Sequence, residues 1–373
     1  MKLKKLVLAL TAGALILTQP LAIHGQTQIT KDQEYLETVK KYILETYPDP
    51  VTEEQLYDEA IKGMFNALDP YSEYLDKEDA KEFYQDLEGT QVGIGIIYSM
   101  NQGKPTIMEV LEDSPAKRAC MKIGDVITSV DGNPIAPTDT LEQISKRIKG
   151  DQGSSVKISV QRGNQAMEFS LKRDLIKMSP ASAKILDNNI GYLRIKEFTP
   201  DSYQYVKGYV DMLKGKNVKK MVLDLRGNPG GSVDQVVEIA QLFVPKGKII
   251  DVKYKDGTVT THMSKGELAF ENVVVLVDGG SASASEILAG AIQDRKSGVL
   301  VGEKTFGKGR VQNILPLTNG DMVRLTIAKY YLPSGRNIDH VGIEPDYKVV
   351  LNPPTNEGIV DNQMKKAIEI LGK

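Results

Sequence analysis

The chain contains 373 residues, 41% of them hydrophobic and 26% charged, and its formal net charge at pH 7 is -2. This composition is that of a globular protein with two or three domains, and a sequence without a large basic block argues against a nucleic-acid partner. The only cysteine, Cys120, excludes an intramolecular disulfide. A hydrophobic core must therefore hold the folded chain together.

Residues 1–25 have the pattern of a secretory signal peptide. Three lysines among the first five residues precede an almost wholly apolar stretch at 6–17, and small residues follow near Gly25. The apolar stretch is short for a membrane span. We therefore predict export to the periplasm or another extracytoplasmic compartment. Ile23-His24-Gly25 is an imperfect cleavage signature, so a leader that is retained as a membrane anchor remains an alternative.

Residues 26–88 are predicted to be helical, because apolar residues recur there at helical spacing. The segment is too small to hold a core alone, so it packs either on the rest of the chain or on a partner subunit. A capping subdomain of a monomer and a dimer-forming element both fit this pattern. The three apolar stripes consist of Tyr35, Leu36, Val39 and Ile43, then Leu56, Ile61, Met64, Phe65 and Leu68, then Phe83, Tyr84 and Leu87.

Residues 89–174 are predicted to form a compact module with strands, tight turns and a helix at 140–148. Near its start, Gly93, Ile94, Gly95 and Ile96 alternate glycine with β-branched residues. This alternation is typical of a strand edge at which backbone amides are exposed.

Residues 175–352 alternate strands with helices, which predicts an α/β sheet with functional residues at the strand ends. A glycine-rich turn, Arg226-Gly227-Asn228-Pro229-Gly230-Gly231, follows one buried strand, and Lys255-Asp256-Gly257 predicts a hairpin. The last segment, 353–373, includes a predicted amphipathic helix at 358–371. In the 175–352 body, strands are predicted at 190–195, 220–225, 273–277, 311–315 and 322–331, and helices at 203–213 and 232–243.

Three serines at alternate positions, Ser281, Ser283 and Ser285, follow the predicted strand at 273–277. Ser283 and Glu286 fit a capping box, which puts Ser283 at a helix N-terminus. Free N–H groups and the helix dipole stabilise negative charge there, as the oxyanion of an acyl transfer requires. We therefore predict that one of these serines is a nucleophile.

Lys308 is the predicted base. It can act only when neutral, which requires its pKa to fall from about 10.4 to about 7 or 8. The segment 305–309 suits the burial that lowers a lysine pKa, because it has no carboxylate, one aromatic residue to exclude water and flanking glycines. Gln312 can orient the amine without stabilising its charge. The positions of the three histidines argue against a conventional Ser-His-Asp triad. His24 lies in the predicted leader, His262 in a polar insertion and His340 in a late loop.

Two other interpretations exist for these residues. The serine run alone fits a helix cap with small-residue packing. The segment 302–309 differs by one residue from the phosphate-binding pattern G-x-x-x-x-G-K-[ST], because Gly309 replaces the Ser or Thr. A strand rather than a helix is predicted after it, so nucleotide binding is disfavoured.

The motifs G-S-A-S-A-S-E and T-F-G-K-G-x-V-Q together resemble the active-site region of the carboxy-terminal processing peptidases, also called tail-specific proteases. The L-D-L-R-G-N-P-G-G turn and L-D-P-Y-S at 68–72 match the same family, and S-P-A, G-D-x-I and V-D-G within 89–174 resemble a PDZ domain. The resemblance covers about residues 60–350. It implies a multidomain α/β protein with an N-terminal helical segment, a PDZ domain and a catalytic body of the ClpP/crotonase-like type.

By position, the resemblance implies that Ser283 is the nucleophile, Lys308 the general base and Gln312 the residue that orients the lysine. It also implies an oxyanion hole formed by the N–H of Ala284 and that of Gly230 or Gly231. Which glycine contributes is left open.

The resemblance further implies a serine endopeptidase that captures apolar protein C-termini as an added strand, with their carboxylate at residues 93–96. No metal or other cofactor is expected, and homodimers through the N- and C-terminal helices are one alternative for the assembly. Lys149-Gly150 stands where related sequences often have Arg-Gly, so a bidentate guanidinium contact is in doubt there. A PDZ adaptor without catalysis and a histidine-dependent hydrolase are the rival functions.

Overall fold

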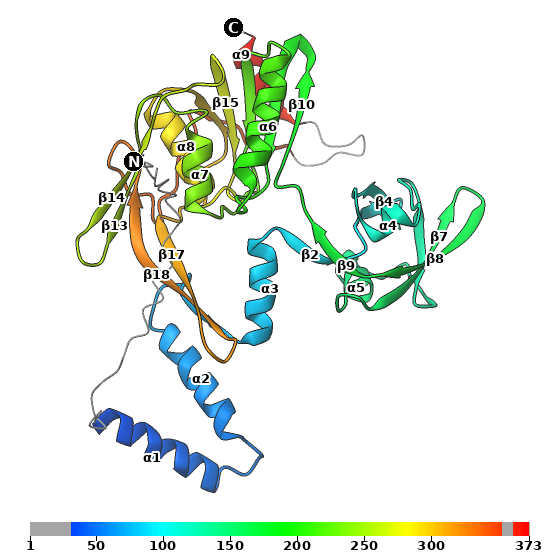
Figure 1. Ribbon diagram of the computed structural model, residues 1–373, viewed down its shortest axis with the longest axis vertical. Helices are drawn as coiled ribbons and strands as arrows, with labels where there is room; N and C mark the ends of the chain where they lie inside the picture. The colour runs from blue at the N-terminus through cyan, green and yellow to red at the C-terminus, as the bar shows by residue number, and fades with distance from the viewer. Residues whose placement is uncertain (1–30, 353–360, 373) are drawn as a thin grey trace, which may run out of the picture. The chain divides into compact units, whose positions relative to one another are not determined.

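The computed structural model describes residues 31–352 and 361–372 (Figure 1). The chain divides into two compact units, residues 1–64 and 65–373, and each is described by itself. The predicted leader and the first three residues of the predicted helix at 358–371 lie outside the described residues. Within those ranges, no helix combines the length and the apolar character needed to cross a membrane.

The first unit contains helix α1 (Lys31–Thr46) and most of helix α2 (Glu53–Phe65). The ammonium group of Lys40 joins them through the Glu53 carboxylate and the Tyr57 ring. Neither helix has a buried residue. This agrees with the prediction that the segment cannot build a core alone.

Residues 96–172 form a six-stranded antiparallel sheet packed on helix α5 (Leu141–Ile148). Its main strands run in the order β3 (Ile96–Asn101), β4 (Lys104–Val110), β5 (Val126–Val130), β7 (Ser155–Arg162) and β8 (Gln165–Lys172), with β6 (Asn133–Pro134) beside β5 and the short helix α4 (Pro115–Arg118) after β4. A capping box between Thr140 and Gln143 begins α5. Because β3 is an edge strand, its outer side is open to an added strand. Strands β2 (Thr90–Gly93) and β9 (Asp174–Lys177) pair with each other at the two ends of this module.

The body is built on a six-stranded sheet with a hydrophobic cluster on each face. Strands β11 (Ile190–Ile195), β12 (Lys220–Asp224), β15 (Asn272–Val277), β16 (Val299–Gly302) and β19 (Tyr347–Lys348) are parallel, and β10 (Ala181–Leu186) is antiparallel to β11. A short 3-10 turn, Asp187–Asn189, joins β10 to β11.

Helices cover both faces of this sheet, because successive strand residues point to opposite sides. The larger cluster lies under α6 (Ser202–Gly215), α7 (Val233–Ala240) and α8 (Ala284–Asp294). The smaller cluster lies under α9 (Asn362–Leu371), whose Ala367 and Leu371 are buried. The apolar side of the C-terminal helix therefore packs on its own sheet.

A second sheet has the order β1 (Glu73–Leu75), β18 (Met322–Tyr331), β13 (Gly247–Tyr254) and β14 (Val259–Ser264), and β17 (Arg310–Pro316) pairs with β18. Helix α3 (Lys77–Leu87) follows β1. The β13–β14 pair confirms the hairpin predicted at 255–257. Figure 1 shows β17 and β18 as a long hairpin, drawn in orange. The predicted mixed α/β architecture is thus confirmed, although the helix predicted at 232–243 ends at Ala240.

Candidate active site

Two adjacent parallel strands deliver the two predicted active-site segments to one edge of the sheet. Strand β12 leads into the glycine-rich turn, strand β15 leads into the serine run, and Asp224 is in register with Leu276 near their ends. The carboxyl ends of parallel strands form the usual site of an open α/β sheet. The two segments are also bonded directly, since Gly227 N donates to Asp278 Oδ1 (2.8 Å).

Asn228 is the residue that fastens the glycine turn to the serine run. It is fully buried. Its carbonyl oxygen accepts hydrogen bonds from Ala282 N (3.0 Å) and Ser285 Oγ (3.0 Å), and its side-chain Oδ1 accepts one from Gly230 N (2.9 Å). Asn228 is not among the predicted site residues, because the local motif does not show that it bonds to residues more than 50 positions away.

The three serines have different environments. Ser281 and Ser285 are fully buried. Ser281 Oγ donates to Leu225 O (2.8 Å), and Ser285 Oγ is held by Asn228. Ser283 alone is partly exposed. The structure therefore gives a physical reason for preferring Ser283 that the spacing of the serines did not give.

Ser283 has a backbone conformation that is rare for a residue with a side chain. Its φ is 52° and its ψ is -113°, and helix α8 begins at the next residue. Strain of this kind costs of order 1–3 kcal/mol and is concentrated at functional sites. The turn places Ser283 at the N-terminus of α8, as the capping-box argument predicted, and Glu286 Oε2 accepts from Ser283 N (2.9 Å).

Glu286 connects the serine turn to the lysine loop. Its carboxylate is fully buried and accepts four hydrogen bonds. Burial raises the pKa of this carboxyl, and the four donors act in the opposite direction. Since a carboxylate only accepts hydrogen bonds, four converging donors match its charged form. The donors are Ser283 N, Lys308 N, Gly307 N and Thr305 Oγ1, at 2.9, 2.9, 2.8 and 2.5 Å.

Replacing Glu286 by glutamine should damage both stability and catalysis. The amide has nearly the same size, but its NH2 group faces N–H donors, so at least one buried donor loses its acceptor at a cost of about 1–3 kcal/mol. We expect turnover to fall about 10- to 100-fold. Urea unfolding and peptide cleavage measure the two effects, with Glu271→Gln, on an exposed pair with Lys219, as the control. Unchanged turnover in Glu286→Gln would show that the loop does not depend on this carboxylate.

Lys308 is half-buried and precedes strand β17. Burial lowers the pKa of its ammonium group, and the charge of Arg324 lowers it further, while Asp69, Glu73 and Glu286 act in the opposite direction. The direction agrees with the requirement for a neutral amine.

The aromatic residue that shields Lys308 is not the predicted one. Phe306 is 54% exposed, whereas Lys308 Nζ lies 5.0 Å from the centroid of the Tyr71 ring. The motif predicts shielding by Phe306, which is close in sequence, but the aromatic ring next to Lys308 belongs to Tyr71, more than 200 residues away in the chain.

Gln312 forms no hydrogen bond with Lys308 in the part of the chain that the structure describes. Its Nε2 donates to Thr326 Oγ1 (3.3 Å) across the β17–β18 pair. Among the described residues, no hydrogen bond joins Lys308 Nζ to Ser283 Oγ or to Gln312. The three predicted side chains thus come from neighbouring segments, but the structure does not show them bonded to one another.

The two candidate oxyanion glycines also differ in position. A Cβ atom on Gly230 would lie 2.8 Å from Ser283 Cβ and 3.0 Å from Ala284 N, whereas one on Gly231 would lie 2.4 Å from Phe198 O. Gly230 therefore borders the nucleophile turn, although its N–H donates to Asn228 Oδ1 here. Both glycines have positive φ values, 108° and 132°, so neither position suits another residue.

Within residues 31–352 and 361–372, no hydrogen bond joins a histidine side chain to Ser283. His340 N donates to Gly307 O (2.8 Å), but the side chain of His340 is 64% exposed beside Asp339. His262 lies on strand β14. His24 falls outside the described residues. Within the described ranges there is no group of three or more His, Cys, Asp or Glu side chains that could hold a metal ion.

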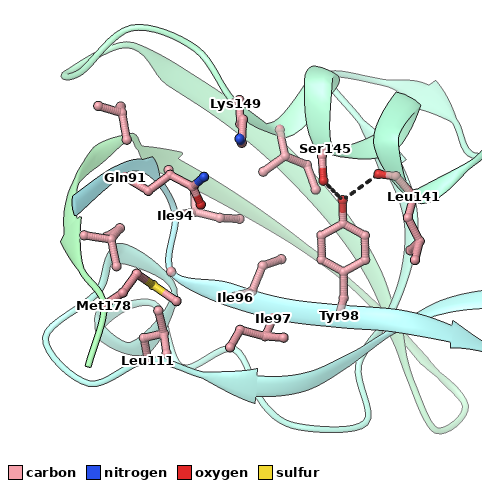
Figure 2. Close-up of a pocket in the computed structure, with 15 residues that line it drawn as sticks. Gln91, Ile94, Ile96, Ile97, Tyr98, Leu111, Leu141, Ser145, Lys149 and Met178 are labelled. Atoms are coloured by element: carbon pink, nitrogen blue, oxygen red, sulfur yellow. Dashed lines mark hydrogen bonds between the residues drawn. The ribbon is translucent and has the colours of Figure 1, made fainter. Parts of the chain in front are cut away.

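The module at 96–172 and the β2–β9 ribbon form a groove of about 250 Å³ along the edge strand β3 (Figure 2). The residues predicted to bind a peptide carboxylate, Gly93, Ile94, Gly95 and Ile96, all line it, and Lys149 lies at the same groove. Gly95 is required there, because its φ is 79° and a Cβ would lie 2.1 Å from Ser114 Cβ. Figure 2 shows the Tyr98 hydroxyl bonded to Ser145 Oγ (2.7 Å) and Leu141 O on helix α5.

Family models match three parts of the chain. Residues 189–349 match peptidase family S41, residues 92–172 match the PDZ domain, and residues 18–79 match the N-terminal domain of the activating protease CtpB.

Curated relatives extend over almost the whole chain. It is 33% identical to the carboxy-terminal-processing protease of Bartonella bacilliformis, covering 93% of this chain and 81% of the relative. It is 35% identical to the carboxy-terminal processing protease CtpA of Bacillus subtilis, with coverage of 93% and 74%.

Two solved structures share the fold. The photosystem II D1 C-terminal processing protease has a TM-score of 0.52 and 24% identity, covering 92% of this chain and 98% of that one. A putative S41 protease from Bacteroides fragilis has a TM-score of 0.58 and 18% identity, with coverage of 90% and 97%.

Proposed function

The chain belongs to the carboxy-terminal processing proteases of peptidase family S41, and from this premise we propose that it is an exported serine endopeptidase with a Ser-Lys dyad. The observation that carries the proposal is the joining of the Ser283 turn and the Lys308 loop by the buried Glu286 carboxylate. Because one carboxylate bonds to the backbone N–H groups of both residues, the arrangement supports Ser283 as the nucleophile and Lys308 as the base.

In the proposed reaction, Ser283 Oγ attacks the carbonyl carbon of the scissile peptide bond. The neutral Lys308 amine takes the hydroxyl proton and gives it to the leaving amine, which leaves an acyl-enzyme. Water then attacks the ester carbonyl and gives its proton to Lys308, which returns it to Ser283 Oγ as the C–Oγ bond breaks and the carboxylic acid product leaves. The N–H of Ala284 at the start of α8 is one oxyanion donor. Gly230 is the favoured second donor because it borders Ser283, and its N–H must then turn from Asn228 Oδ1 to the oxyanion.

Substrate selection is assigned to the groove beside β3. A peptide that adds to the free edge of β3 would place alternate side chains toward α5 and its carboxylate toward the loop at 93–96. The groove has apolar walls, including Ile94, Ile96 and Leu141, and Lys149 adds a positive charge. These features support apolar C-terminal tails as ligands. Lys149 would act as a point charge rather than a bidentate partner.

Export is proposed from the leader pattern, and dimerisation is proposed from the exposed N-terminal helices. The leader pattern at 1–25 supports export, with or without retention as an anchor. Helices α1 and α2 expose apolar side chains such as Tyr35, Tyr42 and Met64. This supports a homodimer contact through the N-terminal helices.

Cleavage of an unfolded reporter protein tests the proposal. We expect a reporter with an apolar C-terminal tail to be cut at least about tenfold faster than the same reporter whose last three residues are aspartate. Leu141→Asp at the groove should remove this preference by raising KM, whereas Met108→Asp, which is exposed on β4 away from the groove, should retain it. Equal rates on both tails would overturn recognition by the groove. Tail binding with no cleavage would instead favour an adaptor, and loss of cleavage in His340→Ala would favour a histidine-dependent hydrolase.

A further inference from the structure

The L-D-P-Y-S segment at 68–72 has no part in the reaction described above, yet it is firmly attached beside the lysine loop. Asp69 accepts hydrogen bonds from Tyr71 N (3.0 Å) and Thr326 Oγ1 (3.1 Å) and forms an ion pair with Arg310 (3.3 Å). Ser72 Oγ accepts from Thr326 N (3.0 Å). These bonds fix the segment on strands β17 and β18, and β17 begins two residues after Lys308.

Tyr71 is the member of this segment that reaches Lys308. The Nζ atom of Lys308 lies over the Tyr71 ring at 5.0 Å from its centroid, within the range of a cation–π interaction. Such an interaction exists only while the amine is charged. The ring therefore favours the ammonium form of Lys308, whereas burial and Arg324 favour the neutral amine.

The other charged groups around this pair are already defined by the fold. Three carboxylates raise the pKa of Lys308 and so favour its charged form. They are Asp69 in the 68–72 segment, Glu73 on β1 and Glu286 on α8. Arg310 is paired with both Asp69 and Asp339. Burial raises the pKa of the Tyr71 hydroxyl, the charges of Asp339, Glu286 and Asp69 raise it further, and the charge of Arg310 lowers it. None of these charged groups depends on the aromatic ring. Leucine keeps an apolar side chain over Lys308, so Tyr71→Leu removes the cation–π contribution while the charges and the apolar shielding remain.

We propose that Tyr71 is a positioning residue for the general base: its ring holds the Lys308 ammonium where it is not bonded to Ser283 and releases the amine when the proton is lost. The catalytic meaning of this position rests on the proposed Ser-Lys function. Deprotonation then does two things at once, because it makes Lys308 a base and removes the attraction that keeps it over the ring.

Direct titration of Lys308 tests the contact without requiring activity. The full chain carrying Ser283→Ala is labelled with 13C-lysine, and the Lys308 signal is assigned by its loss in Lys308→Met. In Tyr71→Leu we expect the titration midpoint to fall by about half a pH unit to one unit. Tyr71→Phe retains the ring and should retain the midpoint, as should the control Tyr47→Leu, which replaces an exposed tyrosine in the first unit. Tyr71→Met provides a second aliphatic replacement if the leucine variant does not fold. An unchanged or higher midpoint in the folded aliphatic variant would overturn the proposal.

The same substitutions in the Ser283 enzyme separate this inference from the proposed function. If Lys308 is the base, the basic limb of kcat/KM against pH should move in Tyr71→Leu by the same amount as the midpoint, and it should stay in Tyr71→Phe. If the titration midpoint of Lys308 shifts but the basic limb of kcat/KM does not, Tyr71 binds the ammonium group as proposed, and Lys308 is not the general base.

Discussion

Ser283→Ala is expected to lower kcat/KM on a tailed reporter by at least about 10⁴-fold, whereas Ser285→Ala leaves most of the activity. Removing a serine nucleophile eliminates the acyl-enzyme route, and only binding and the oxyanion donors remain. Ser285 Oγ instead donates to Asn228 O, which also accepts from Ala282 N. Its loss therefore leaves that carbonyl with one partner and should cost about 1 kcal/mol of unfolding free energy.

Steady-state cleavage and urea unfolding of both variants, measured side by side, check this prediction. The chemistry of the substitution is the same in both, and only the position of the hydroxyl differs. An active Ser283→Ala together with an inactive Ser285→Ala would mean that the nucleophile is misassigned.

The backbone of Ser283 supplies an independent expectation about the same position. With φ at 52°, alanine keeps the strain of a side chain in the left-handed region, while glycine relieves it. Ser283→Gly should therefore be more stable than Ser283→Ala by about 1 kcal/mol, although both are inactive. Equal unfolding free energies would indicate that the turn relaxes when the hydroxyl is removed.

The sequence predicted the elements whose signals are local. The apolar run at 273–277, the helical spacing after Ile287 and the 255–257 turn each depend on neighbours within a few residues, and the structure has β15, α8 and the β13–β14 hairpin there. The expectation that functional residues lie at the strand ends follows from the general geometry of α/β sheets. Hence the edge of the sheet that carries the site was predictable.

The residues that hold the site together were not predictable in this way. Asn228 and Tyr71 act through contacts with segments that are distant in sequence, and a motif shows residue type without showing where a side chain points. Glu286 was recognised as part of a helix cap, but not as the acceptor for the loop that begins 19 positions later. For the same reason Phe306 was expected to shield Lys308 and is instead exposed.

Lys308→Met is expected to abolish cleavage, and Lys308→Arg should be equally inactive because a guanidinium remains protonated at every accessible pH. In the wild type, kcat/KM should rise with pH along a limb that reports the lysine. Since burial lowers the pKa of Lys308, the limb should lie below the value of about 10.4 for an exposed lysine. Lys304 is exposed and paired with Glu344, so Lys304→Met is a matched control. It should retain both the cleavage rate and the position of the basic limb of kcat/KM.

Stability should depend on pH through the same group, with a definite sign. Between the lowered pKa of Lys308 in the folded state and its ordinary value in the unfolded chain, the unfolded chain binds more protons, so the unfolding free energy rises with pH. Below that window, the wild type carries a buried charge at a cost of about 1.4 kcal/mol for each unit by which the pKa is lowered. Lys308→Met lacks this cost. It should be more stable than the wild type at neutral pH, and its advantage should shrink as the pH rises toward 10. Urea unfolding of the two proteins from pH 6 to 10 measures the difference, and parallel curves would mean that Lys308 is not the tuned amine that the reaction requires.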